Sequence, residues 1–423
     1  MTEQTRLQSE EEKKKEQRKK RMRTLTYVIV GILIVALVSV VAVGASRGLW
    51  LKKSTVKIVT VLPFDVEEGA GIAWPLRHAM ELALEEADHR AGDLTVEFEA
   101  WNSADEEGMP VAEKETEYAE QAAADPDVVA FMGSLSSSGC KESIPILNRA
   151  GVAQLSSTAT YPGLTKSGFG AGEPAIYYPS GERTFFRVVT PDDMQGPAGA
   201  LWARDLGFER IYIVEQNDLF GYGLAQTFRQ TAEANGMTIV GSSAVEPNQQ
   251  EGFEEILADI AAQEPDLVYQ AGFGGTGNAL VPAMRAAGLE TSLMGTTLAT
   301  EADERLFGIK GVMSTHSGIP TGELNEETLD FARRFEERFG YQLGGRAFWA
   351  AMAYDAMGIA LASIEQAGEA DRAAVVEALH EIEYNGIAGR WSFDENGDTN
   401  LLLVTGFVLE EDEWQSVGLL RVR

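Results

Sequence analysis

The sequence predicts an α/β protein of two lobes, preceded by one N-terminal transmembrane helix. Short β-branched runs alternate with longer helical periods from residue 55 onward, and this βαβ order calls for a mostly parallel sheet covered on both faces. A glycine- and proline-rich segment at 161–183 interrupts the alternation, which then restarts and indicates a second lobe. Residues 25–45 form a long apolar run without a charge.

The apolar run 25–45 has the length of about 20 residues that spans a bilayer as a helix. Positive charge marks the cytoplasmic side, so we expect a cytoplasmic tail at 1–24 and residues 55–423 in the periplasm or outside the cell, on a single-pass protein of the cytoplasmic membrane. A cleaved signal peptide is the alternative, but its apolar region is normally shorter and Val43-Gly44-Ala45 is a poor cleavage site. Just before the run lie Lys13, Lys14, Lys15, Arg18, Lys19, Lys20, Arg21 and Arg23, and just after it lie only Arg47, Lys52 and Lys53.

The first α/β run begins with the β-branched stretch TVKIVTVL, followed by a helical spacing of apolar residues. Its expected strands are 55–62, 94–100, 128–133 and 152–156, and its expected helices are 74–91, 111–124 and 138–150.

The second run follows the glycine-rich segment, and a third completes the chain. In the second run we expect strands at 210–215, 237–244, 266–271 and 292–295, with helices at 194–206, 221–235, 252–263 and 276–287. In the third we expect a strand at 311–317, helices at 325–339, 346–367 and 371–383, and a strand-rich tail at 387–420.

The charge balance excludes nucleic acid as a partner. The chain holds 35 Lys+Arg and 65 Asp+Glu, a net charge of −30. Residues 1–54 carry 12 basic and 5 acidic residues (+7), so residues 55–423 carry 23 and 60 (−37). Cys140 is the one cysteine, which excludes an intramolecular disulfide and a thiol-rich metal site, and we expect it to be buried on a helix.

Catalytic signatures are absent from the sequence, so we expect no enzyme, no catalytic residue, no bound metal and no cofactor. There is no G-x-S-x-G, H-E-x-x-H or P-loop, and the four histidines are widely scattered. Gly272–Gly277 satisfies G-x-G-x-x-G, but the next strand ends in threonines where a dinucleotide site has an acid. Residues 394–400 lack the glycine and glutamate of a calcium loop and are interpreted as a hairpin turn.

Two clusters of hydroxyl side chains follow neighbouring strands. Ser136, Ser137 and Ser138 open a helix, where free amides and the helix dipole suit a carboxylate. Thr158 and Thr160 follow the next strand and would face the same space, because ligands bind off the carboxyl ends of parallel strands. Plain helix capping and a Ser/Thr-rich turn are the alternatives, but two clusters at neighbouring strand ends favour a pocket.

Four stretches, at 73–88, 131–165, 185–231 and 389–398, resemble the leucine/isoleucine/valine-binding proteins, the type I periplasmic receptors of ABC importers. The resemblance implies two Rossmann-like lobes, a ligand cleft between them and three hinge crossings. The crossings are expected near 188–192, 317–321 and 390–396, with lobe 1 at about 55–188 and 320–392 and lobe 2 at about 189–319 and 393–423.

The resemblance also implies roles for individual residues. Ser137, beside Ser136 at the helix start, and Thr160 would hold a ligand carboxylate, and the Thr158 carbonyl would face an ammonium group. Phe220 and Phe273 would be the aromatic contacts of the second lobe. The loop around Ile72 and Trp74 would cover the ligand side chain.

One departure from the family concerns the ligand's amine. Amino-acid binders of this group place an acidic residue where this chain has Thr297, and Glu301 could substitute only if the loop differs. A buried ammonium group without a carboxylate partner is costly. The resemblance implies an amino acid as ligand, but this departure favours an amide, a urea-like compound or a carboxylate without an amine.

The predicted function is an extracytoplasmic solute-binding receptor that captures a small polar ligand for the permease of an ABC importer. The alternative is a ligand-sensing ectodomain that partners a separate signalling protein. An enzyme is disfavoured by the missing catalytic groups.

Overall fold

The computed structural model describes residues 14–15, 18–22, 54–64, 71–106, 108, 110–300, 303–318 and 326–421. Contacts divide the chain into two compact units, Met1–Lys53 and Ser54–Arg423. In the first unit, the described residues 14–15 and 18–22 are helical. The predicted membrane span 25–45 and most of the predicted tail 1–24 lie outside the described residues.

The first sheet of the second unit has six strands in the order β2-β3-β1-β4-β5-β6. All its pairs are parallel except β2 with β3, as the βαβ pattern predicts. The strands are β1 (Thr55–Leu62), β2 (Arg90–Ala91), β3 (Leu94–Asn102), β4 (Val128–Met132), β5 (Ala153–Ser156) and β6 (Phe185–Arg187).

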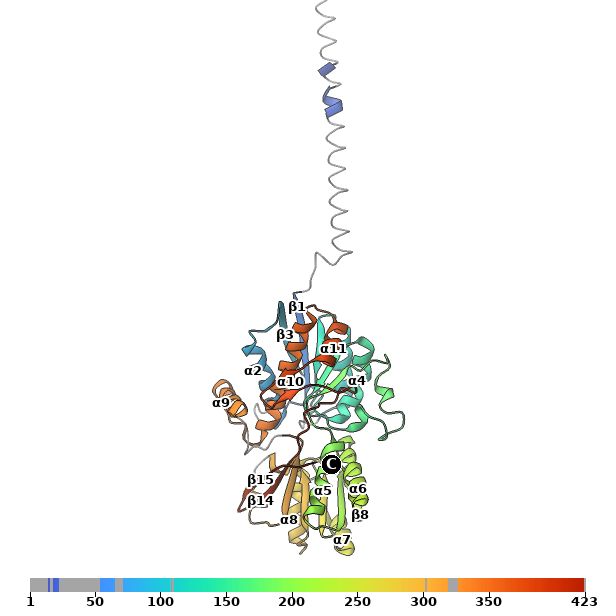
Figure 1. Ribbon diagram of the computed structural model, residues 1–423, viewed down its shortest axis with the longest axis vertical. Coiled ribbons are helices and arrows are strands. Elements are labelled where there is room, and N and C mark those ends of the chain that lie inside the picture. The colour runs from blue at the N-terminus through green and yellow to red at the C-terminus, as the bar shows by residue number, and fades with distance from the viewer. Residues whose placement is uncertain are drawn as a thin grey trace, which may run out of the picture. The chain divides into compact units, whose positions relative to one another are not determined.

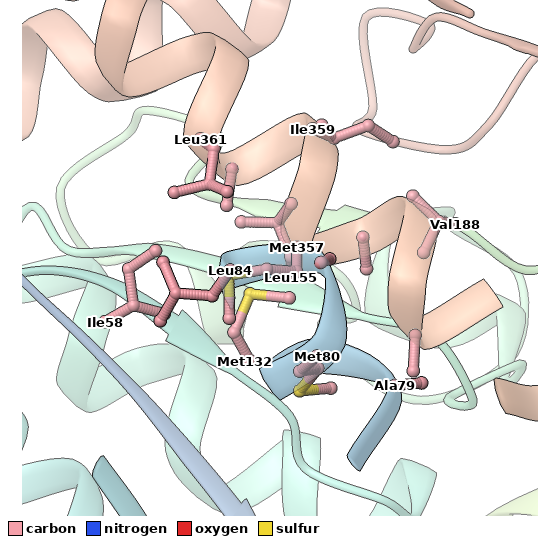
Figure 2. Packing of buried hydrophobic residues seen from close by; sticks show 14 of the residues in the cluster. Ile58, Ala79, Met80, Leu84, Met132, Leu155, Val188, Met357, Ile359 and Leu361 are labelled. Atoms are coloured by element: carbon pink, nitrogen blue, oxygen red, sulfur yellow. The ribbon is translucent and has the colours of Figure 1, made fainter. Parts of the chain in front are cut away.

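Helices from both ends of this unit cover the first sheet (Figure 1). They are α2 (Ala73–Glu86), α3 (Ala112–Ala124), α4 (Ser137–Ala150), α9 (Glu326–Phe339), α10 (Ala347–Ala367) and α11 (Arg372–Glu381). Figure 2 shows Ile58 and Met132 of the sheet in one apolar cluster with Met80 of α2 and Met357 of α10. Val59, the next residue of β1, belongs to the cluster on the opposite face, with α3 and α4. The near-continuous apolar run of β1 is thus explained by burial on both faces.

The second sheet has seven strands in the order β15-β14-β11-β10-β9-β7-β8. Its parallel part has α5 and α6 packed in one apolar cluster and α7 and α8 in another. The strands are β7 (Arg210–Gln216), β8 (Thr238–Val245), β9 (Leu267–Ala271), β10 (Ser292–Thr296), β11 (Val312–His316), β14 (Thr405–Glu410) and β15 (Glu413–Leu419). The helices are α5 (Asp192–Asp205), α6 (Leu219–Ala234), α7 (Glu254–Gln263) and α8 (Gly274–Ala286).

The chain passes between the two sheets three times, which confirms the two-lobe α/β fold. The links are 188–191, the segment after β11 that begins at 317 and of which 319–325 lie outside the described residues, and 392–404; the third follows the short hairpin of β12 (Tyr384–Asn385) and β13 (Arg390–Trp391). The third link is longer than the predicted 390–396. The predicted lobe boundaries and the hinge role of the links remain predictions.

Several local predictions are settled by the structure. The helix expected at 74–91 is too long: α2 ends at Glu86, and Asp88 and His89 take positive φ values of 52° and 54°, which an α-helix does not contain. The three-residue strand β6 was missed. Cys140 is buried on α4 as predicted, and Phe393 pairs with Thr399 across the predicted turn.

One helix among the described residues, Gly344–Ala367, is long and apolar enough to cross a membrane. Its most apolar stretch is 78% buried inside the protein, and Met357 and Ile359 of this helix belong to the core of the first lobe (Figure 2). Burial in a protein core explains its composition without a bilayer.

Candidate functional site

The two predicted hydroxyl clusters lie side by side, because β4 pairs with β5 and each cluster follows one of these strands. The Thr158 hydroxyl donates to the Leu135 carbonyl at 2.6 Å. The Ser137 hydroxyl, which is buried, accepts from the Tyr161 backbone N–H at 3.1 Å. The loops that follow the two strands are therefore joined by hydrogen bonds.

The hydroxyls of these clusters differ in what they leave available for a ligand. Ser136 is the N-cap of α4, and its hydroxyl accepts from the Gly139 N–H at 3.0 Å. Thr158 donates its proton to the other loop. Ser137 accepts one hydrogen bond but keeps its proton to donate. The buried Thr160 hydroxyl makes no hydrogen bond of ordinary geometry within the described residues.

Asp192 brings a carboxylate to the Thr160 loop. It is the first residue of α5, directly after the first link between the lobes, and its N–H donates to the Thr160 carbonyl at 2.9 Å. Its side chain is fully buried, and neither carboxylate oxygen makes a hydrogen bond of ordinary geometry to any described residue. Burial raises the pKa of Asp192 well above its usual value, although the nearby Thr160 hydroxyl and the Arg187 charge partly oppose this.

The surroundings of Asp192 come from both lobes. A side chain at Gly223 of α6 would place its Cβ 2.7 Å from Oδ2 of Asp192 and 3.0 Å from the Tyr161 ring, so this glycine permits the close approach. The hydroxyl of Tyr269, on β9, is also buried and has no hydrogen-bond partner in the described part of the chain. Burial raises the pKa of Tyr269, and the Asp192 charge raises it further.

Unpaired buried polar groups of this kind are uncommon, because each loses its hydration without compensation. Thr160, Asp192 and Tyr269 combine a hydroxyl, a carboxylate and a phenol near the junction of the two lobes. The carboxylate can accept hydrogen bonds, and the two hydroxyls can both donate and accept them.

The two predicted aromatic residues of the second lobe lie together. The rings of Phe220 and Phe273 have their centroids 5.2 Å apart, and Phe273 is 41% exposed. Gln216 supports this pair, because its side-chain oxygen accepts from the Phe273 N–H at 3.1 Å. The pair offers an apolar surface where β7 and β9 end.

Thr297, at the position where the resemblance implies an acidic residue, makes a hydrogen bond within the protein. It takes a left-handed φ of 61°, and its hydroxyl accepts from the Gly274 N–H at 2.9 Å at the start of α8. Glu301 lies outside the described residues. Residues 297–300, the described part of this loop, contain no acidic residue.

Trp74 lies in the first turn of α2, where its ring packs against Phe64 at 5.0 Å between centroids. The Arg77 guanidinium lies 5.3 Å from the Trp74 ring centroid. The neighbouring residues 65–70 are outside the described part of the chain. A contact of Trp74 with the ligand stays a prediction.

Asp192 and Tyr269 are the groups that sequence reasoning missed. Asp192 opens a helix, where an acidic residue is expected from the helix dipole alone, so its residue type carried no signal. The position of Asp192 did carry a signal, because it follows the first link between the lobes and directly precedes a second acid, Asp193. Tyr269 lies inside an apolar strand and reads as an ordinary core residue.

Comparisons with known proteins agree with the fold described above. The family described as periplasmic binding protein matches residues 55–402. The leucine-, isoleucine-, valine-, threonine- and alanine-binding protein of Pseudomonas aeruginosa is 25% identical over 285 residues, which cover 64% of this chain and 69% of the relative. The Leu/Ile/Val/Thr-binding protein of Salmonella typhimurium is 24% identical over 300 residues, which cover 68% of this chain and 73% of the relative.

Solved structures show the same fold. A leucine-binding protein from Thermotoga maritima superposes with a TM-score of 0.72 at 21% identity, covering 86% of this chain and 99% of the other. An ABC-transporter solute-binding protein from R. palustris, in complex with benzoate, gives a TM-score of 0.70 at 18% identity, covering 86% and 96%. The ligands in this fold therefore include a carboxylate without an amine.

Proposed function

Because this chain belongs to the periplasmic binding protein family, we propose that it captures a small ligand with both a carboxylate and an amine, of the amino-acid class, for an ABC importer. It is a solute-binding protein of the leucine/isoleucine/valine-binding kind and not an enzyme. The relatives named above bind branched-chain and small amino acids by their names, which supports this ligand class.

The observation that carries the amine is the buried carboxylate of Asp192: neither oxygen makes a hydrogen bond of ordinary geometry to a described residue, although the Thr160 hydroxyl lies close enough to lower its pKa. An ammonium group beside Asp192 would supply charge-assisted donors to this carboxylate. Charge-assisted hydrogen bonds of this kind are about twice as strong as neutral ones. Asp192 would then pair with the ligand's ammonium group, the role that the resemblance implies for an acidic residue at the position of Thr297.

The ligand carboxylate belongs at the start of α4 in this proposal. The Ser137 hydroxyl can donate there, and the first amides of the helix present positive dipole charge. Phe220 and Phe273 provide apolar contact for the rest of the ligand. A ligand that spans these groups carries opposite charges a few bonds apart, as an α-amino acid does.

We also propose that the protein is held at the cytoplasmic membrane by residues 25–45, with its N-terminus in the cytoplasm and its binding domain outside. The uncharged run and the basic residues before it support this topology. N-terminal sequencing of membrane-extracted protein tests it: an intact N-terminus is expected, and a mature start near Ser46 in a soluble fraction would contradict it.

A thermal-shift panel on the full-length protein in detergent tests the ligand class. The panel pairs each amino acid with its deaminated acid, as with L-leucine and 4-methylpentanoate, and adds amides and urea. We expect the melting temperature to rise with an amino acid and much less with its deaminated partner. Equal or larger shifts with the deaminated acids would contradict the amine proposal, and no shift with any compound would contradict the ligand class.

A further inference from the structure

Arg187, the last residue of β6, has a guanidinium group that is completely buried and bonded to four oxygen atoms. Its Nε donates to Asp398 Oδ1 at 2.7 Å, and one Nη donates to the carbonyls of Ala159 and Tyr161 at 3.2 and 3.0 Å. The other Nη donates to the Thr165 hydroxyl. Four of the five N–H donors of this buried guanidinium are therefore engaged within the protein.

Asp398 anchors Arg187 to the third link between the lobes. The Arg187 N–H donates to the Gly397 carbonyl at 3.0 Å, so the backbones are joined as well as the side chains. Burial alone would raise the pKa of Asp398, but the charges of Arg187 and Lys166 hold it below its usual value. Lys166 lies 3.0 Å from Asp398 and 2.7 Å from Asp193 of α5.

The two carbonyls that Arg187 binds flank Thr160. One guanidinium nitrogen, Nη1, therefore holds the backbone on both sides of Thr160, while the other nitrogens of the planar group bond Asp398 and Thr165. The same segment carries the Tyr161 N–H that bonds Ser137 and the Thr160 carbonyl that accepts from Asp192. A lysine could pair with Asp398 but could not reproduce this geometry, because its ammonium group has no rigid fork.

We propose that Arg187 is a positioning residue for the ligand site: with Asp398 it ties the Thr160 segment to the first and third links between the lobes. The charge of the pair is fully enclosed, so its role is to fix geometry. A buried ion pair is weak evidence for stability by itself, whereas fixing one arrangement of a polar site is a role that such pairs can serve. The effect on ligand affinity rests on the proposed function, but the effect on the segment does not.

The test compares Arg187→Lys with Arg372→Lys by hydrogen exchange of the full-length protein without ligand. Arg372 is a matched control, since it too donates to several backbone carbonyls, among them Val128 at 2.9 Å and Ala150 at 3.1 Å, near the opposite ends of β4 and β5. Arg187→Lys should speed exchange of the Tyr161 and Asp192 amides about tenfold or more. Arg372→Lys should instead speed exchange around Val128 and Val152 and leave Tyr161 unchanged.

A second variant keeps the proposal decidable if Arg187→Lys does not fold. Thr165→Val removes one acceptor of Arg187 and should speed exchange at Tyr161 by a smaller factor. Unchanged exchange at Tyr161 in the folded variants, or an equal increase in Arg372→Lys, would overturn the proposal.

Titration with L-leucine, or with the best amino acid of the thermal-shift panel, adds the affinity measurement. Arg187→Lys should bind the amino acid about tenfold more weakly than wild type does, and Arg372→Lys should bind it about as tightly as wild type. Equal binding by both variants would overturn the positioning role. If wild type binds no amino acid, the proposed function fails, and the exchange result alone decides the role of Arg187.

Discussion

Ser137→Ala separates the ligand role of this hydroxyl from its structural role. The hydroxyl accepts from the buried Tyr161 N–H at 3.1 Å, so its loss leaves a donor unpaired and should cost about 1–3 kcal/mol of folding stability. The cap of α4 is not affected, because Ser136 provides it. A ligand carboxylate would lose one charge-assisted hydrogen bond, so affinity should fall about ten- to hundredfold.

Thr297→Ala is the matched control for this variant. It also removes a hydroxyl that accepts from one backbone N–H, that of Gly274 at 2.9 Å, so it should cost a similar amount of stability. Its affinity should change little, because we propose no ligand charge there. Denaturant unfolding and calorimetry with the amino acid found by screening measure both effects. Wild-type affinity in Ser137→Ala with lost binding in Thr297→Ala would refute the placement of the carboxylate.

Three further predictions concern the pH dependence of stability, the space around Asp192 and the closure of the lobes. Burial raises the pKa of Asp355 to about 6 from 3.8, so this group should lower stability by about 3 kcal/mol as pH rises from about 4 to 6; Asp355→Asn should lack this dependence in urea unfolding, and an identical pH profile would contradict it. Gly223→Ala should weaken binding by crowding Asp192 and should also cost about 1–3 kcal/mol of folding stability, because the added Cβ would meet buried atoms of Asp192 and Tyr161; unchanged affinity would contradict the close approach. Small-angle scattering should give a smaller radius of gyration with saturating ligand, and an unchanged profile would contradict lobe closure.

The fold could be predicted because both lobes use long, regular signals. β1 reads as a continuous β-branched run since both of its faces are buried, and α10 reads as an apolar helix for the same reason. β6 was missed because three residues are too short to show a period, and its neighbours are irregular. The end of α2 was missed because the left-handed residues Asp88 and His89 are ordinary helix-compatible types in the sequence.

The site could be predicted only where residues follow strands close in sequence. Ser137 and Thr160 belong to neighbouring strand ends, and the structure joins their loops through the Tyr161 N–H. Asp192 reaches the same loop from the other lobe, and Arg187 binds Asp398 across 211 positions of sequence. Such partners are set by the path of the links, which no local pattern contains.

The central claim, that Asp192 recognises an amine, is tested most directly by calorimetry on wild type and Asp192→Asn, with Asp193→Asn as a neighbouring control. Wild type and Asp193→Asn should prefer L-leucine, or the best amino acid found, over its deaminated acid. At a pH between the ligand-bound and ligand-free pKa values of Asp192, binding should also release a proton, because an ammonium group lowers the raised pKa of this carboxyl.

Buffers of different ionisation enthalpy measure this proton release. Asp192→Asn should lose both the release and the preference, with affinity for the amino acid reduced about tenfold or more. A preference and a proton release that persist in Asp192→Asn would contradict the account.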